Sequence, residues 1–430
     1  MEKLGISENK KYLTCGGKPF FWLGDTGWLI FHKLTEEDAF VYLKNRADKG
    51  FTAIQAVLIY ATEGLCDINK MYIPNCNVED IKYWEHCDRV IKKAGEFGLY
   101  MALLPCWGSL LKAGVITEEN VERYAEFIGE RYKNYDNIVW VLGGDIRPMG
   151  FEKIYDTMGR ILKEKNPDRL ITFHPFGRCA SSTWFNDRDW LDFNMFQSGH
   201  RRYDQGSLGR WDDNKRAEGF FGEDNWKYVL RDRERLPLKP TLDAEPSYEW
   251  ILQGLHDPTQ PYWTATHVRR YAYWSVFAGA CGHTYGDNSV MQFYGGKDEP
   301  TQGVNNYGVR ENWKISLHHE GSGQMKYLKD LVTSVDFTTG EAKDELIIGG
   351  QREKHERIAV FAGEDFLFAY TWLGKEFELD TSNYKGFDAW WFTPSKGIYS
   401  YLGKINEDRF KACPPEVFDE DRDRVLVLRR

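Results

Sequence analysis

The sequence predicts an α/β protein built as a (β/α)₈ TIM barrel followed by a small antiparallel β-sandwich. Short apolar runs alternate with amphipathic helical patterns from about residue 20 to residue 333, in eight cycles, as in a parallel barrel. Several apolar runs end in a charged or hydrogen-bonding side chain. After residue 336 only short alternating runs remain, separated by Gly, Asp and Asn turns, and this pattern is typical of a sandwich.

The first half of the predicted barrel alternates regularly between strand and helix. The run FFWLGD (20–25) predicts the first buried strand. Thr35 opens a helix with the capping pattern Thr-Glu-Glu-Asp, and Gly50 ends it as a left-handed cap. The run FTAIQAVLIY (51–60) predicts the second strand. A helix over 83–97 then leads to the third strand, LYMALLP.

The second half repeats the cycle. A helix beginning near Thr117 precedes the fourth strand, NIVWVLGGD, and a helix over 151–165 precedes the fifth, RLITFHP. The runs DFNMFQSGH, KPTLDAEP and GHTYG supply strands six to eight. A doubly wound open sheet is the alternative arrangement. No glycine-rich phosphate-binding fingerprint follows the first strand, which favours the barrel.

The chain is expected to form two domains. Residues 1–335 would be the barrel, and residues 336–430, with runs such as RIAVFAG and DAWWFTP, the β-sandwich. The long polar segments 60–80, 198–235 and 286–312 follow strands, so they should lie on the same face as the strand ends. Loops of this length in a compact domain are usually functional.

Composition narrows the classes of partner. The chain has 430 residues and a net charge of −9 without a basic tract, which argues against nucleic acid. No apolar run approaches the roughly 18 residues that cross a membrane, and the N-terminus lacks the apolar segment of a secretory signal. The 8 cysteines are scattered without a C-x-x-C pair, as expected for reduced thiols without a zinc site. We therefore expect a cytoplasmic enzyme without a metal or other cofactor.

Two carboxylates carry most of the functional information. Asp145 closes the run NIVWVLGGD and Glu245 lies in KPTLDAEP, and each is followed almost at once by proline. A barrel strand that ends in a carboxylate presents it at the rim. Two such acids suit glycoside hydrolysis, in which one protonates the leaving oxygen and the other attacks or activates water. Either acid alone is more often a helix cap or a rim salt bridge.

The two acids would need different protonation states at the working pH. Following the usual rim arrangement, Asp145 would be the general acid/base and Glu245 the nucleophile. A separation of about 5–5.5 Å would indicate retention of configuration, and one of about 6.5–9.5 Å inversion. Aromatic residues make up 15% of the chain, including 16 Trp, and flat rings can cover the apolar faces of a sugar.

The other strand ends offer polar and aromatic side chains that should converge on the same face. A hydroxyl-rich ligand such as a carbohydrate requires groups of this kind. The candidate substrate-binding residues are Asp25, Trp28, Gln55, Trp107, Arg147, His174, Gln197, His200, Asp243, His283, Tyr285 and Asp287.

Several of these candidates have structural alternatives. Asp25 could cap the turn that follows it, and His174 could be a hydrogen-bonded core histidine. Asp243, two residues before the predicted nucleophile, could raise the pKa of that acid by repulsion or serve as a structural hydrogen-bonding acid. His283 and Tyr285 lie beside glycines, where the permissive backbone favours a pocket role.

Seven runs of the sequence resemble the signature runs of the apiosidase-like glycoside hydrolases, and together they cover nearly the whole chain. They are FFWLGDTGW, KGFTAIQAV, GLYMALLPCWG, NIVWVLGGDIRP, DFNMFQSGH, LDAEPSYE and GHTYG. The final segment, with DAWWFTPSKG, is similar to the collagen-binding-like β-sandwich that follows the barrel in that family.

This resemblance implies a retaining enzyme that releases terminal apiose, a branched pentose. It also implies that Asp145 of the GGD run matches the acid/base and Glu245 of the LDAEP run the nucleophile. The run GDNSV after GHTY departs from the family pattern, which carries histidines there, so Asp287 and Asn288 are expected to alter the sugar-binding subsite.

The combined prediction is an intracellular, retaining exo-glycosidase that removes a terminal pentofuranose, with apiose as the leading sugar. One alternative keeps the mechanism and changes the sugar to another furanoside or glycoside. Two others are a non-catalytic carbohydrate- or matrix-binding protein and a metal-dependent barrel hydrolase. The sandwich, with its Trp390–Trp391 pair, is expected to brace the barrel rather than to bind a ligand.

Overall fold

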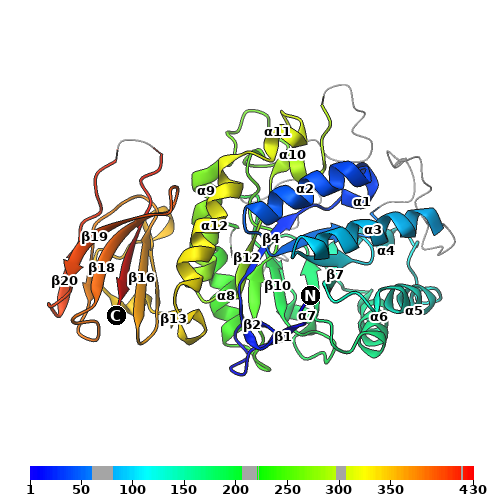
Figure 1. Ribbon diagram of the computed structural model, residues 1–430, viewed down its shortest axis with the longest axis horizontal. Helices are drawn as coiled ribbons and strands as arrows, with labels where there is room; N and C mark the ends of the chain where they lie inside the picture. Colours follow the sequence, from blue (N-terminus) through cyan, green and yellow to red (C-terminus); the bar gives the residue numbers. More distant parts are fainter. Residues whose placement is uncertain (61–80, 206–219, 221, 297–306, 418–419) are drawn as a thin grey trace.

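The computed structural model describes the whole chain except residues 61–80, 206–219, 221, 297–306 and 418–419. In this described part, eight parallel strands form the predicted barrel, which confirms the fold class (Figure 1). They are β4 (Trp22–Thr26), β5 (Ala53–Val57), β6 (Tyr100–Leu104), β7 (Ile138–Ile146), β8 (Ile171–Pro175), β10 (Asn194–Gln197), β11 (Thr241–Asp243) and β12 (Gly282–Tyr285).

The strands follow one another around the barrel in chain order. The hydrogen-bonded order is β8-β7-β6-β5-β4-β12-β11-β10, and the short β9 (Cys179–Ala180) adds antiparallel to β10. Across the remaining gap, the Thr172 hydroxyl donates to the Phe193 carbonyl at 2.7 Å, and the Asp192 N–H donates to the Ile171 carbonyl at 2.8 Å. These two bonds hold β8 beside the start of β10, so the barrel is nearly closed.

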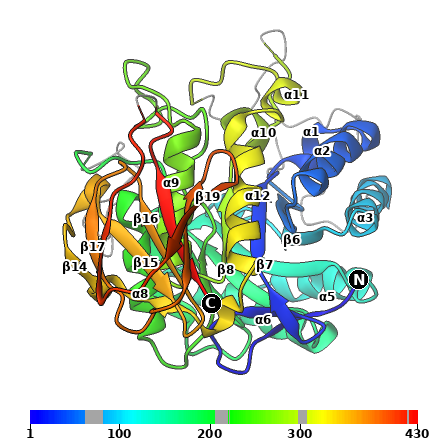
Figure 2. The same ribbon diagram turned by 60° about the vertical axis from the view of Figure 1, so that its left-hand side comes forward.

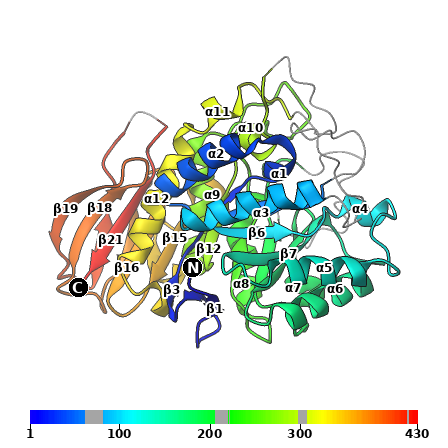
Figure 3. The same cartoon turned by 45° about the vertical axis from the view of Figure 1, so that its right-hand side comes forward.

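Helices surround the strands (Figure 3). Thr35 caps the first long helix as predicted, because its hydroxyl accepts the Asp38 N–H at 3.2 Å. The longer helices are α2 (Glu36–Asp48), α3 (Ile81–Glu96), α5 (Val121–Tyr132), α6 (Glu152–Lys165), α8 (Asn225–Arg233), α9 (Ala265–Phe277) and α12 (Glu320–Thr333). The short ones are α1 (Ile30–Lys33), α4 (Ser109–Lys112), α7 (Ser182–Phe185), α10 (Asn288–Met291) and α11 (Trp313–Ser316). None in the described residues is long and apolar enough to cross a membrane.

Two parts of the barrel differ from the sequence prediction. The segment 198–235, expected to be a loop, contains helix α8, whose charged side chains and short apolar face hid the helical period. Of the segments 60–80 and 286–312, residues 61–80 and 297–306 lie outside the described residues, and α10 forms in the described part of the second segment. The N-terminus forms an unpredicted antiparallel sheet of three-residue strands, too short to show a period: β1 (Leu4–Ile6), β2 (Leu13–Cys15) and β3 (Lys18–Phe20).

The C-terminal segment is the predicted antiparallel β-sandwich (Figure 2). Its larger sheet has the order β13-β15-β16-β21-β18-β19, from β13 (Glu341–Ala342), β15 (Ile358–Ala362), β16 (Phe366–Thr371), β21 (Arg424–Arg429), β18 (Asp388–Thr393) and β19 (Ile398–Lys404). The smaller sheet has the order β14-β17-β20, from β14 (Ile347–Gly349), β17 (Phe377–Asp380) and β20 (Arg409–Ala412).

In the larger sheet, β15, β16 and β21 are buried on both faces, because alternate residues point to opposite sides of a strand. One face, including Val360 and Leu426, packs against the smaller sheet. The other face packs on α9 of the barrel, where Tyr370 stacks on Tyr273 with ring centroids 4.7 Å apart. The sandwich therefore shares a continuous hydrophobic core with the barrel.

Candidate active site

Asp145 projects from the end of β7 through a backbone that only glycine allows. Gly143 and Gly144 have φ values of +98° and +96°, and Asp145 itself has +49°. A Cβ on Gly143 would lie 2.2 Å from the His174 carbonyl oxygen, and one on Gly144 would lie 2.8 Å from the Trp107 ring. The register of β7 against β8 shifts here. This bulge turns Asp145 toward the site, and such local strain is characteristic of functional positions.

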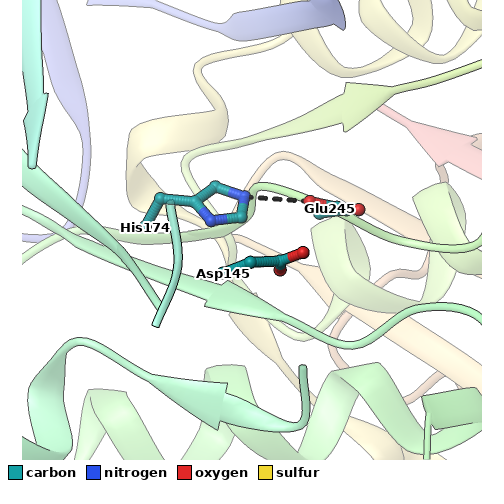
Figure 4. A group of neighbouring side chains, drawn as sticks. All are labelled: Asp145, His174 and Glu245. Carbon is teal, nitrogen blue, oxygen red and sulfur yellow. Dashed lines mark ion pairs between the residues drawn. The ribbon is translucent and has the colours of Figure 1, made fainter. Parts of the chain in front are cut away.

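Glu245 follows β11 and faces two imidazoles. His174, at the end of β8, places Nε2 3.2 Å from Glu245 Oε2. His200, after β10, places Nε2 3.0 Å from Oε1. Asp145 lies beside this group, so side chains from neighbouring strands converge at one end of the barrel (Figure 4). The three residues Asp145, His174 and Glu245 each offer a polar atom within 4.8 Å of the others.

Burial and neighbouring charge separate the protonation behaviour of the two acids. Burial, together with the charge of Glu245, raises the pKa of Asp145 to about 6. For Glu245 burial acts in the same direction, but the imidazoles of His174 and His200 outweigh it and lower the pKa to about 2. Between these values Asp145 is protonated and Glu245 is ionised. A proton donor beside a carboxylate nucleophile is the arrangement that glycoside hydrolysis requires.

The two acids line a cavity of about 450 Å³. Six of the sequence-predicted residues lie on its wall: Trp28, Trp107, Asp145, Gln197, His200 and Glu245. His174 is fully buried behind them, with its ring 5.3 Å from Trp28 and 6.2 Å from Trp107. Arg147 is not among the wall residues, but its guanidinium stacks on the ring of Phe176, which is one, at 4.3 Å.

Asp25 and Gln55 are buried away from the cavity. Asp25 pairs with Arg46 at 2.5 Å and accepts the Tyr42 hydroxyl at 2.7 Å. Gln55 donates to the Ala244 carbonyl at 2.9 Å, next to the predicted nucleophile. The prediction of direct sugar contact therefore needs correction for both residues. The missed signal for Asp25 is an arginine twenty-one positions away on α2, which only the packing of helix on strand brings near.

Asp243 and His283 are also fully buried behind the cavity wall. Asp243 accepts hydrogen bonds from the Ser198 hydroxyl at 2.5 Å and the Asn225 amide at 3.0 Å. Burial raises its pKa to about 7. Of the two roles considered for this residue, the arrangement favours the structural hydrogen-bonding acid. His283 Nδ1 lies 3.2 Å from the Ser275 hydroxyl, and His283 is not among the residues that line this cavity.

Tyr285 and Asp287 belong to a buried polar network rather than to the cavity wall. The Tyr285 hydroxyl donates to Glu249 at 2.5 Å. Asp287 caps α10 and lies 2.6 Å from His319 Nδ1. The run GDNSV predicts that Asp287 contacts a sugar directly. In the structure, Asp287 is buried in this network and does not line the cavity.

The sequence did not single out several wall residues. Tyr248, three positions after Glu245, receives a hydrogen bond from the Trp28 indole at 3.0 Å and packs edge-on against His200 at 4.8 Å. Its position in the same loop as the predicted nucleophile was an available signal. The others, which have no motif of their own, are Leu29, Tyr60, Phe176, Gly177, Gly199, Arg201, Ile251, Leu255, His256, Met291 and Tyr307.

The same site offers the ligand types that divalent metals accept. Among the described residues, Asp145, His174 and Glu245 are the cluster whose ligand atoms approach closely enough to hold an ion. Two carboxylates and an imidazole would suit such a cation. The geometry is therefore compatible both with paired acids and with a metal, and the two possibilities separate experimentally.

Comparisons with known proteins agree with the geometry. Residues 7–339 match the family model "Apiosidase-like, catalytic domain", and residues 343–429 match "Putative collagen-binding domain of a collagenase". A solved structure described as a glycoside hydrolase is 38% identical, with a TM-score of 0.93 over 100% of this chain and 97% of that one. No curated protein matches.

A second solved structure is a glycoside hydrolase family 5 protein from Bacteroides vulgatus ATCC 8482. It is 37% identical, with a TM-score of 0.93 over 99% of this chain and 93% of that one. The family match covers most of the sequence, and both relatives align over nearly their full lengths. The chain thus belongs to the apiosidase-like catalytic domain family and is a glycoside hydrolase.

Proposed function

We propose that the protein is a retaining exo-glycosidase that releases a terminal pentofuranose, with apiose as the sugar. The observation that carries this proposal is the separated protonation of Asp145 and Glu245 across one cavity. Asp145 would protonate the leaving oxygen while Glu245 attacks the anomeric carbon. Asp145 would then remove a proton from the water that hydrolyses the glycosyl-enzyme intermediate.

The closeness of the acids supports retention. A carboxylate oxygen of Asp145 and one of Glu245 lie within 4.8 Å of each other. Inverting enzymes hold their carboxyl groups about 6.5–9.5 Å apart to admit a water between them. The closer approach of Asp145 and Glu245 leaves little space for such a water. It therefore favours direct attack by Glu245 and a covalent intermediate.

The size and lining of the cavity support the release of a small terminal sugar. A volume of about 450 Å³ lies in the lower part of the usual range of about 300–1,000 Å³ for small-molecule sites. Trp28, Tyr60 and Trp107 contribute flat rings, and Gln197 hydrogen-bonds Asp145 through its side chain. Aromatic faces and a few polar groups together suit one sugar and the start of its aglycone.

Family membership supports apiose as the sugar. The run GDNSV, which departs from the family pattern, would affect the sugar subsite indirectly. The Asn288 amide donates to the Tyr307 carbonyl at 3.1 Å, and Tyr307 lies on the cavity wall. Asn288 would therefore influence the subsite by holding that wall.

We also propose that the catalytic domain ends near residue 335 and that the sandwich braces it through Arg269, which pairs with Asp423 at 2.9 Å.

We expect a reducing compartment, as the scattered cysteines suggest. Within the described residues the cysteines at 15, 87, 106, 179, 281 and 413 are all free thiols. Free buried thiols are typical of cytoplasmic enzymes. Localisation of the tagged chain in its native host would test this expectation.

Sugar release from apiosyl, arabinofuranosyl and galactofuranosyl glycosides tests the proposal. Wild type, Glu245→Gln and Glu234→Gln (a surface control at the end of α8) would be compared. Apiose release that survives in Glu234→Gln and disappears in Glu245→Gln supports both the sugar and the nucleophile. NMR of the first-formed anomer reports retention.

Two other results would change the conclusion. Release of a different sugar, again lost in Glu245→Gln, keeps the mechanism and replaces apiose. Activity abolished by a chelator and restored by a divalent cation would replace the paired-acid mechanism with a metal-dependent one, whereas unchanged activity after chelation removes that alternative. Tight ligand binding without turnover of any glycoside would favour a binding protein.

A further inference from the structure

The β-sandwich touches the loop that carries His200. His355 lies in the short 3-10 turn η5 (Lys354–Glu356) of the sandwich. Its Nε2 lies 2.8 Å from Glu223 Oε2. Glu223 belongs to the turn η2 (Gly222–Asp224), which precedes α8 of the barrel, and is only 1% exposed. A partly exposed side chain of one domain thus contacts a buried carboxylate of the other.

Glu223 in turn holds the backbone three residues after His200. Its Oε1 accepts the Tyr203 N–H at 2.8 Å, and Arg270 of α9 donates to its other oxygen. The Tyr203 hydroxyl donates to Asp224 at 2.6 Å. The ring of Tyr203 also packs against the His355 ring, with centroids 5.1 Å apart. The Tyr203 amide is therefore held by Glu223, which His355 contacts, and the Tyr203 ring is held by His355 itself.

Three residues before Tyr203, His200 has a backbone that needs such support. Its φ is +87°, in the left-handed region that non-glycine residues rarely adopt and that the surrounding structure must hold in place. The run is anchored on the other side by the Gly199 N–H, which donates to the Glu245 carbonyl at 3.0 Å, and by the His200 N–H, which donates to Ser247 at 3.2 Å. The imidazole of His200 can face Glu245 only while this run keeps its shape.

We propose that His355 of the β-sandwich is a positioning residue for catalysis: through Glu223 and Tyr203 it holds the 199–203 run so that His200 faces the nucleophile Glu245. The inference rests on the proposed function, because it takes Glu245 as the nucleophile. The sandwich is then part of the catalytic apparatus as well as a structural support, and removing one hydrogen bond at its surface alters chemistry in the barrel.

A simple bracing role predicts something different. His355 also packs against Trp372 at 5.1 Å, and Trp372 lies under the Arg270 guanidinium at 4.2 Å, so His355 is part of the contact between the domains. If that were its whole role, its loss would lower the melting temperature without changing the site. The other charged groups around the His355–Glu223 pair are Arg270, Lys354 and Asp224.

The test compares His355→Ala, His355→Gln and Arg352→Ala. Glutamine can place an N–H near the position of Nε2, whereas Arg352, three residues earlier, pairs at 3.8 Å with Glu356 inside the sandwich and serves as the local control. Backbone hydrogen exchange of the peptide spanning 199–205, melting temperature and the pH profile of kcat/KM on the cleaved glycoside are measured for each.

We expect His355→Ala to speed exchange in the 199–205 peptide and to lower kcat/KM about tenfold, the effect of one lost hydrogen bond to a charged group. The acid limb of its pH profile should move to higher pH, because His200 then stabilises ionised Glu245 less well. His355→Gln should restore much of each property, and Arg352→Ala should behave as wild type.

Unchanged exchange in His355→Ala overturns the proposal whatever the wild-type enzyme cleaves. Faster exchange with kcat/KM and acid limb equal to those of Arg352→Ala overturns it too, because the run would then move without affecting the nucleophile. If wild type cleaves no glycoside, the proposed function fails. With no turnover, the positioning of the nucleophile fails with it, even where exchange in the run has changed.

Discussion

Substitution of Gly144 by alanine tests how the backbone presents Asp145. Gly144 has a φ of +96°, and alanine in this region costs about 1–2 kcal/mol. The added Cβ would also lie 2.8 Å and 3.0 Å from two carbons of the Trp107 ring and 3.2 Å from the Gly108 nitrogen. Overpacking of this kind costs about 1–3 kcal/mol more. We therefore expect the free energy of unfolding to fall by about 2–5 kcal/mol.

Gly150→Ala is the matched control, because it isolates the backbone cost from the packing cost. Gly150 lies a few residues farther along the same loop with a φ of +87°, and a Cβ there would meet nothing within 4 Å. It should lose only the backbone share, about 1–2 kcal/mol. Urea unfolding of both variants measures the difference, which should equal the cost of moving Trp107.

The activity of the same variants shows whether the bulge serves catalysis. Trp107 lies on the cavity wall 6.2 Å from the His174 ring, so its displacement moves the acids relative to the sugar. A misplacement of about 1 Å can cost about a hundredfold in rate. Gly144→Ala should therefore lose far more kcat/KM than Gly150→Ala. Equal stability and equal activity of the two variants would refute the close approach of Trp107 as the feature that positions Asp145.

Three further predictions follow from the site and the domain contact. Asp145→Asn should lower kcat by about 10²–10⁴-fold on glycosides whose leaving group must be protonated. The loss should be smaller on glycosides whose leaving group needs no proton, and equal losses on the two kinds of substrate would contradict an acid role. The pH profile of wild-type kcat/KM should fall as pH rises through about 6, where Asp145 loses its proton, and should fall on the acid side only as pH approaches 2, where Glu245 gains one. A wild-type acid limb well above pH 2 would count against this assignment. Arg269→Ala should lower the free energy of unfolding by about 3–5 kcal/mol, because the buried Asp423, 2.9 Å away, would lose its charge partner. Urea unfolding measures this change, and a loss below about 1 kcal/mol would show that the Arg269–Asp423 pair does not hold the domains together.

Much of the fold was predictable because its signals are local. An apolar run, a helix cap such as Thr35 and a stop such as Gly50 lie within a few residues of one another. The period of each segment then indicates strand or helix without knowledge of its neighbours. Short segments escaped, because a three-residue strand or the nine-residue helix α8 contains too few positions to show a period.

The candidate site was predictable in part. Strand ends indicated which residues would reach the rim, and Asp145, Glu245, Trp28, Trp107, Gln197 and His200 do line the cavity. The same reasoning could not separate a side chain that faces the cavity from one that is paired beneath it. Asp25 meets Arg46 and Asp287 meets His319 across distances in sequence that no local pattern spans.

The sequence by itself determined the barrel and the sandwich and predicted the two acids, because each of these depends on residue type and spacing along the chain. The tertiary structure alone decided which acid holds the proton, since that depends on burial and on two histidines that come from other strands. It also decided that a histidine of the sandwich lies next to a loop of the active site. Electrostatic effects act through space, so they are set by distances that form only when the chain has folded.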